Sequence, residues 1–414
     1  MKMKNLKTVC LVACVAMMSV SGPARLNETG MNWMPVTSAA AEDETAQLRQ
    51  RGNDAYNAEN YEEAVKWYTR AAVEGDAEAQ RMLGVCYEYG RGVTQDEFEA
   101  FNWYGKSASQ GNADAQNSLG FCYGRGQGVT QDYEKAVEWF TKSAEQGHEV
   151  AQCGLGLCYE FGIGIEQDYT KAAEWYAKSA EQGYDLAQCN LGYCYEIGQG
   201  VDQDYAKAAE WYAKAAEQGV DVAQYNLGLL YEKGRGVEQD YVKAVGWYAK
   251  AAEQGLDVAQ YNLGLLYKNG LGVEQDYEKA VEYFRKAADQ GNINSLEWMG
   301  YCYQQGKGVE DIDYAKALEY YLKADEQGSE FAPNEIGNIY YNGGYGVEQD
   351  YEKAVEWFQK AAEQGNTWSL YMMGFCNEYG QGTEQNSEKA IEWYQKAVEN
   401  GSEGAQKALE RLGM

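Results

Sequence analysis

Histidine and proline are nearly absent from this chain, in which 414 residues include one histidine and three prolines. The single histidine, His148, excludes every catalytic or metal site that needs two histidines, and a Ser–His–Asp or Cys–His set would have to include it. It stands at a turn that leads into a predicted helix, where a capping role is expected. Carboxylate pairs such as Glu238 and Asp240 recur in nearly every predicted loop, so no single pair marks an active site. We therefore predict no catalytic, cofactor or metal site and no enzymatic activity.

Basic residues are also scarce, since 35 Lys and Arg stand against 64 Asp and Glu and give a net charge of -29. Such a chain repels phosphate backbones, and no stripe of Lys and Arg offers the counterion release on which nucleic-acid affinity rests. Nucleic acid is therefore not an expected partner. Hydrophobic residues make up 45% of the chain and aromatic residues 14%, which is ample for a packed core.

Long hydrophobic runs are missing except near the amino terminus, where three lysines within seven residues precede the mostly apolar segment 8–20. This is the layout of a secretory signal, and the segment is too short to span a bilayer comfortably. We predict a signal peptide over residues 1–24, with cleavage as late as Ala41 as the alternative, and a flexible lead-in over residues 25–44. The protein is then exported, to the periplasm or the secreted space.

Residues 11–14 also resemble a bacterial lipobox that ends at Cys14. Lipidation of Cys14 would anchor the protein to a membrane, and only in that case is membrane contact expected. The soluble exported form is the favoured alternative, because only about six residues of the apolar segment precede Cys14.

A glycine preceded by an apolar residue recurs with a period of 36 residues, then twice with one extra residue in the loop. Such a period is the signature of a solenoid, in which each unit covers its apolar faces only by stacking on its neighbours. The repeat glycines are Gly84, Gly120, Gly156, Gly192, Gly228, Gly264, Gly300, Gly337 and Gly374, and Gly52 opens a shorter first unit. We predict an opening unit over residues 45–75, nine repeats over 76–401 and a capping helix over 402–414.

Each unit reads as two helices, as residues 223–255 illustrate. Apolar residues recur at helical spacing in both halves, and the segment 234–240 joins them. Two glycines in this loop allow a tight reversal with positive φ, Asp240 is placed to cap the second helix, and Gly255 is placed to end it.

Two further columns of residues recur at fixed places and are expected in the core. Large rings in one slot of the second helix should join neighbouring repeats, and small alanines should let the helices approach closely. The rings are Trp67, Trp103, Trp139, Trp175, Trp211, Trp247, Tyr283, Tyr320, Trp357 and Trp393.

The pattern Ala-Gln-x-x-Leu-Gly-x-x-Tyr, then Gly-x-Gly-Val-x-Gln-Asp-Tyr-x-Lys-Ala-x-x-Trp-Tyr, as in residues 223–251, resembles the Sel-one-like repeat family. The opening unit is more similar to a tetratricopeptide repeat. The resemblance implies an all-α, right-handed α/α solenoid that acts as a scaffold or adaptor for a protein or peptide. In exported bacterial members such scaffolds work in the envelope or the secreted space. Two alternatives remain, an exported hydrolase-type protein and a lipid-anchored assembly factor.

Eight cysteines follow the predicted signal, and six of them stand two residues after a repeat glycine, where other units carry Leu or Ile. We expect these six to be buried thiols that act as hydrophobic side chains. Cys153 and Cys189 occupy a different slot, three residues before the glycine, which is predicted to lie outside the core. A disulfide between these two remains an alternative.

The predicted binding residues follow from the first helix of each repeat. Positions six and three before the repeat glycine, and one, four and five after it, vary between units, and we call them the inner slots. By resemblance to tetratricopeptide repeats they line the concave face, and apolar residues there predict an exposed binding patch. The predicted partner-binding residues are Phe121, Tyr193, Tyr225, Leu229, Tyr261, Leu265, Tyr301, Tyr371 and Phe375.

Arg49 and Asn53 match the first-repeat positions at which tetratricopeptide domains hold a terminal carboxylate. Met82 stands where the second asparagine of such a clamp is needed. A carboxylate clamp is therefore not expected.

Overall fold

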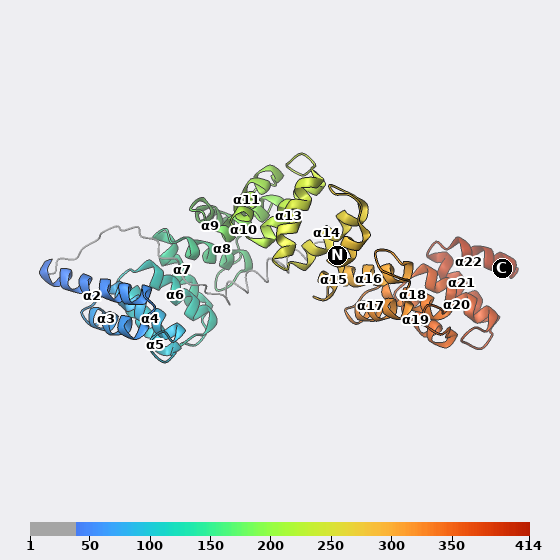
Figure 1. The fold of residues 1–414 in the computed structure, drawn as a ribbon, viewed down its shortest axis with the longest axis horizontal. Coiled ribbons are helices and arrows are strands. Elements are labelled where there is room, and N and C mark those ends of the chain that lie inside the picture. Colours follow the sequence, from blue (N-terminus) through green and yellow to red (C-terminus); the bar gives the residue numbers. More distant parts are fainter. Residues whose placement is uncertain (1–38) are drawn as a thin grey trace. The chain divides into compact units, whose positions relative to one another are not determined.

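The computed structural model describes residues 39–414, with side chains from Glu44 onward. The regular elements of this part of the chain are all helices, and it contains no strand (Figure 1). Its helices are α2 (Ala39–Asn57), α3 (Tyr61–Val73), α4 (Ala77–Tyr89), α5 (Glu97–Ser109), α6 (Ala113–Arg125), α7 (Tyr133–Glu145), α8 (Glu149–Phe161), α9 (Tyr169–Glu181), α10 (Asp185–Ile197), α11 (Tyr205–Glu217), α12 (Asp221–Lys233), α13 (Tyr241–Glu253), α14 (Asp257–Asn269), α15 (Tyr277–Ala288), α16 (Ile293–Gln305), α17 (Tyr314–Glu326), α18 (Ala332–Asn342), α19 (Tyr351–Glu363), α20 (Thr367–Tyr379), α21 (Ser387–Glu399) and α22 (Glu403–Arg411).

Within each of the two units defined below, the helices pack as sequential pairs, α4 with α5, α6 with α7 and so on, and the second helix of a pair packs on the first helix of the next. The described part divides within α12 into two compact units, one from α2 to the start of α12 and one from the rest of α12 to α22. Each unit by itself is the all-α, α/α solenoid that the sequence predicts. The short closing helix α22 packs on α21 and α20, as expected of a terminal cap.

The first helix begins earlier than the sequence predicts. We expected a flexible lead-in up to residue 44, whereas α2 begins at Ala39. The reason is local, because three consecutive alanines with the highest helix propensity precede the acidic turn. The predicted signal peptide, Cys14 and the rest of the lead-in lie outside the described residues. No helix of the described residues is long and apolar enough to cross a membrane.

The loop between the helices of a repeat has the predicted construction, and both of its glycines are required. In the loop after α8, Gly162 and Gly164 have φ of 66° and 69°. A Cβ on Gly164 would lie 2.2 Å from the backbone oxygen of Tyr133, at the start of α7 in the preceding repeat. The second glycine is therefore also an inter-repeat contact, which no larger residue could make. The predicted caps are confirmed: Asp240 accepts the backbone N–H of Lys243, and Gly255 follows α13 with a φ of 97°.

The column of tryptophans is only half-buried, which corrects the prediction that these rings form the core. The buried ring is the next residue along each second helix. These rings are Tyr68, Tyr104, Phe140, Tyr176, Tyr212, Tyr248, Phe284, Tyr321, Phe358 and Tyr394. Each lies against the repeat glycine of its own unit; a Cβ on Gly156, for example, would come within 2.6 Å of the Tyr176 ring. The tryptophan directly precedes the buried ring, so its side chain points to the edge of the core. Lysines cover it there; Lys106 Nζ, for example, lies 3.6 Å from the Trp103 ring centroid.

Most of the buried tyrosines donate a hydrogen bond to a residue four positions after the repeat glycine. Tyr176 donates to Glu160 at 2.6 Å and Tyr212 to Glu196 at 2.7 Å. The partner is Gln304 for Tyr321. Where the ring is Phe, the same slot holds Gly124, Lys268 or Tyr341, none of which is an acidic acceptor. The hydroxyl and its acceptor therefore occur together, as a buried polar group requires.

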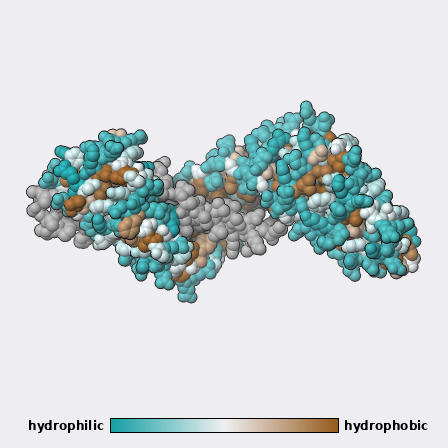
Figure 2. Space-filling view, turned by 90° about the horizontal axis from the view of Figure 1, so that it is seen from below, coloured by the Kyte–Doolittle hydropathy of each residue, from teal (hydrophilic) through white to brown (hydrophobic). Residues whose placement is uncertain are grey.

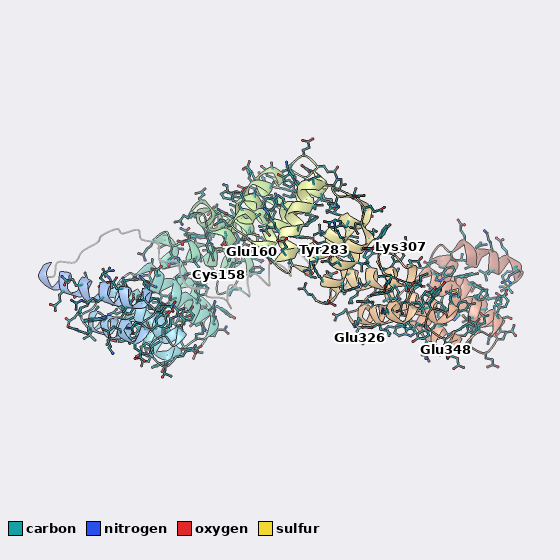
Figure 3. All side chains as sticks on the ribbon, in the orientation of Figure 1. Cys158, Glu160, Tyr283, Lys307, Glu326 and Glu348 are labelled. Carbon is teal, nitrogen blue, oxygen red and sulfur yellow. The ribbon has the colours of Figure 1, made fainter. Side chains whose placement is uncertain are left out.

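The cysteines from Cys86 to Cys376 are all buried and are thiols, not disulfides. Burial raises the pKa of the Cys158 thiol, on α8 with Glu160 (Figure 3), to about 12. The six periodic cysteines are thus confirmed as core residues. Cys153 and Cys189 are buried as well, which corrects the prediction that their slot lies outside the core, and no disulfide joins them.

Candidate functional site

The predicted partner-binding residues do not form one exposed patch. Tyr193 is 7% exposed and belongs to the core, and the other eight are half-buried. The reason is that an inner-slot side chain on one first helix leans against the large ring of the following second helix. Phe121 lies edge-on to Phe140, Tyr225 lies 5.7 Å from Tyr248, and both distances and angles are those of packed aromatic pairs.

The remaining predicted residues share this double role of supporting the core and facing outward. Tyr261 packs on Phe284 at 5.9 Å, Leu265 packs against the same core cluster, and Leu229 is half-buried on α12. Tyr301 lies edge-on to Trp298 at 5.3 Å. Hydrophobic residues accordingly appear as small patches within a hydrophilic surface (Figure 2).

One place on the inner slots is hollow, and it lies between α18 and α20 in the second unit. A cavity of about 250 Å³ opens there. It is lined by residues of two consecutive repeats: Asn338, Tyr341 and Asn342 from α18, and Trp368, Tyr371, Met372 and Phe375 from α20. Six of these seven occupy inner slots, and two of them, Tyr371 and Phe375, are among the residues predicted from the sequence. We call this cavity the α18–α20 pocket.

The walls of the α18–α20 pocket are aromatic and carry no charged side chain. Trp368, 51% exposed, lies 5.5 Å from Tyr371, and Tyr371 in turn packs on the buried Tyr394 at 5.7 Å. Phe375 lies 6.3 Å from Tyr371 on the same helix. The rings thus pack on the core at Tyr394 and are open to solvent at Trp368.

Two asparagines give the α18–α20 pocket its polar groups. Trp368 Nε1 donates to Asn338 Oδ1 at 3.1 Å, and Asn342 Nδ2 donates to the backbone oxygen of Asn338 at 2.9 Å. These bonds hold the indole and both amides in place. They leave the Asn338 amino group as a donor and the Asn342 side-chain oxygen as an acceptor on residues that line the cavity, which is the pair that a peptide group can satisfy.

The pocket exists because this repeat departs from the regular pattern. Tyr341 occupies the slot that holds Glu in the regular units, and the buried ring beneath it is Phe358, which has no hydroxyl to satisfy. A large ring on the inner face thus replaces a buried Tyr–Glu hydrogen bond. Pro333 in the first turn of α18 further replaces the glutamine of the regular repeats.

Sequence reasoning missed five lining residues, namely Asn338, Tyr341, Asn342, Trp368 and Met372. Four of them stand in inner slots, but the predicted binding residues came only from the slots three before and one after the glycine. Trp368 could have been found from the sequence because no other repeat has tryptophan six residues before its glycine.

The residues considered for other chemistry are engaged within the fold. Arg49 forms an ion pair with Asp76 at 2.7 Å, and Asn53 accepts a hydrogen bond from Tyr68. His148 caps α8 by accepting the backbone N–H of Ala151 at 3.2 Å. Among the residues with described side chains, no three His, Cys, Asp or Glu come together as a metal site would require.

Comparison with known proteins identifies the repeat. A model of the Sel1 repeat matches ten segments, at residues 40–76, 77–112, 113–148, 150–184, 185–220, 221–256, 257–292, 294–329, 334–366 and 369–402. The first of these includes the opening unit. No protein among the curated sequences matches.

Two solved structures are similar over most of the chain. One is a protective antigen present in uropathogenic Escherichia coli strains that displays an SLR fold, with 35% identity over 90% of this chain and 81% of that chain and a TM-score of 0.80. The other is a Sel1 repeat protein from Oxalobacter formigenes, with 31% identity over 77% of this chain and 93% of that chain and a TM-score of 0.57.

Proposed function

Because this chain belongs to the Sel1 repeat family, we propose that it is a non-catalytic scaffold that holds an extended segment of a partner protein in its inner slots. Proteins of this family act in protein–protein interaction. The observation that carries the proposal is the α18–α20 pocket, which is uncharged, aromatic and supported by the core.

The size and chemistry of the pocket favour a peptide side chain over a cofactor. A volume of about 250 Å³ lies below the range in which drug-sized ligands are enclosed. Aromatic rings that are already ordered lose little entropy on binding, and rings of this kind are the residues that most often dominate interface energies. One aliphatic or aromatic side chain fits the cavity, while Asn338 and Asn342 meet the peptide group beside it.

The test is a selection of peptides from a random 16-residue phage-displayed library on the purified protein, followed by affinity measurements with a synthetic selected peptide. Trp368→Ala should lower the affinity at least tenfold, a change of about 1.4 kcal/mol. The matched control is Phe98→Ala, which removes an aromatic ring of similar exposure, 61%, from the second helix α5. Equal affinities of the two variants, or peptides without a bulky apolar residue, would contradict the proposal.

Export belongs to the same proposal. It is supported by the basic and apolar layout of the first 24 residues in the sequence. Mass spectrometry of the mature amino terminus in the native host distinguishes cleavage after Ala24, cleavage as late as Ala41 and lipidation at Cys14, and an intact Met1 would contradict export by this signal.

A further inference from the structure

A second group of aromatic residues lies on α14 and α16, earlier in the same unit. The Trp298 ring stacks on the buried Phe284 at 5.8 Å with an angle of 10°, and Tyr301 lies edge-on to Trp298. Tyr261 also packs on Phe284. These rings form an aromatic wall on the buried Phe284, similar to the wall of the α18–α20 pocket. Here, in contrast to that pocket, lysines contact the rings.

Two lysines sit on this aromatic wall. Lys268 Nζ lies 3.8 Å from the Trp298 ring centroid, and Lys307 Nζ, in the loop after α16 (Figure 3), donates to Tyr301 Oη at 3.1 Å. Burial lowers the pKa of Lys268, and the positive charge of Lys307 lowers it further.

Neither lysine forms an ion pair within the part of the chain whose side chains are described, although 64 acidic residues are present in the sequence. The neighbouring carboxylates have other partners. Glu297, in an inner slot of α16, accepts a hydrogen bond from Ser329, and Glu335 on α18 accepts from Gln304. Lysines elsewhere in this unit differ, since Lys286 and Lys323 each pair with a glutamate one turn earlier.

We propose that Lys268 and Lys307 bind a side-chain carboxylate of the partner segment whose apolar residue enters the α18–α20 pocket. The inference rests on the proposed function and names its partner as an acidic peptide. Charge complementarity carries it, because two ammonium groups without an ion-pair partner lie against the same aromatic wall, and one of them, Lys268, is half-buried, which strengthens its attraction for a carboxylate.

The carboxylate belongs to a side chain and not to the end of the partner chain. Half-buried apolar slots precede the lysines at Tyr261 and Leu265, and the α18–α20 pocket follows them along the sequence of repeats. A segment that uses both groups of slots continues past the lysines, so it presents a side chain to them.

The experiment uses the full chain and peptides from the same random library, resynthesised with an amidated carboxyl terminus. We expect the selected peptides to be enriched in Asp or Glu. Lys268→Gln combined with Lys307→Gln should lower the affinity at least tenfold and remove most of its dependence on salt. The matched control, Lys286→Gln with Lys323→Gln, removes two lysines of other faces and should change the affinity less than twofold.

A second measurement keeps the test decisive if the lysine variant folds poorly. Replacing the acidic residue of the peptide by Gln should weaken binding to the wild-type protein as much as the lysine substitutions do, and the two changes together should add little.

The outcomes separate the two proposals. If no peptide is selected, or if Trp368→Ala leaves every selected peptide bound, the proposed function fails. If peptides depend on Trp368 but show no acidic preference and ignore both lysines, only the present inference fails. If binding is lost on amidation, the ligand is a terminal carboxylate and the side-chain assignment is overturned.

Discussion

The inner slots of α8 and α10 and those of α18 and α20 occupy the same positions of the same repeat, yet they differ in what they leave open. In α8 and α10 they hold Cys153, Cys189 and Tyr193, all buried, and Glu196, whose carboxylate is used by a core tyrosine. In α18 and α20 they hold asparagines and large rings around a cavity. Apart from the exposed Phe161 and Ile197, the same backbone thus forms a closed surface in α8 and α10 and an open site in α18 and α20.

The difference extends to the polar bonds between repeats. In the regular repeats a buried glutamine bridges three helices: Gln152 donates to the backbone oxygen of Ala144 and accepts from Gln182. Pro333 and Leu370 stand in this slot in α18 and α20, and Ser369 donates to Asn334 instead. The two repeats that depart from the pattern are therefore those that form the pocket. This indicates that the regular residues maintain the fold and that the deviating residues serve binding.

The largest effect is expected where inner-slot tyrosines also support the core. Tyr225→Ala combined with Tyr261→Ala removes two half-buried rings that pack on Tyr248 and Phe284, so we expect a loss of about 3 kcal/mol in the free energy of unfolding. Sequence alone predicts a nearly neutral change. Chemical denaturation measures the loss, and a neutral double variant would show that these rings are as dispensable for stability as Trp368.

The glycine–ring contact should be equally important in both regions. Gly156→Ala places a Cβ 2.6 Å from the Tyr176 ring and Gly374→Ala one 2.5 Å from Tyr394, so each should cost about 2 kcal/mol through overpacking. Gly154→Ala is the control, because its nearest neighbour, Phe140, is 3.7 Å away. We expect this control to be stabilising by up to about 1 kcal/mol from helix propensity. A stable Gly156→Ala protein would contradict the glycine–ring core.

The closed region should lose stability when the buried hydroxyl of Tyr212 is removed. Tyr212→Phe leaves the Glu196 carboxylate without its donor and should cost about 1.5 kcal/mol at neutral pH. Burial raises the pKa of Glu196, and a raised pKa in the folded state gives stability that is lost as pH rises. As the pH falls toward 4.5, Glu196 takes up a proton and no longer carries a buried charge that needs the Tyr212 donor, so the cost of Tyr212→Phe should shrink. A cost that grows would refute the assignment of Glu196 as a buried acceptor.

The smallest effect is expected at the cysteine slot. Cys158→Leu should change the free energy of unfolding by less than about 1 kcal/mol, because Leu230 and Leu266 fill the same slot in other repeats. With a thiol pKa of about 12, native Cys158 should also resist iodoacetamide at pH 8 until the protein unfolds. Rapid labelling of the native protein would place this slot at the surface.

Much of the fold could be predicted from the sequence because the signals are local and repeated. Helix pairing, the glycine loops, the Asp240 cap and the cysteine slot all follow from spacing within one unit. The choice between Trp175 and Tyr176 for the core could not, since both lie on the apolar side of α9 and the decision depends on Gly156 in another helix. The pocket escaped prediction for a similar reason, because it requires two deviating repeats to be read together.

Photo-cross-linking of a selected peptide to p-benzoylphenylalanine, placed at Phe375 or, separately, at Phe121, distinguishes the open site from the closed inner slots. Both residues stand one position after a repeat glycine, and both are half-buried. Phe375 lines the α18–α20 pocket, whereas Phe121 packs on Phe140 beneath the Arg125 guanidinium. We expect a cross-link from position 375 and none from position 121. A cross-link from position 121 alone would contradict it.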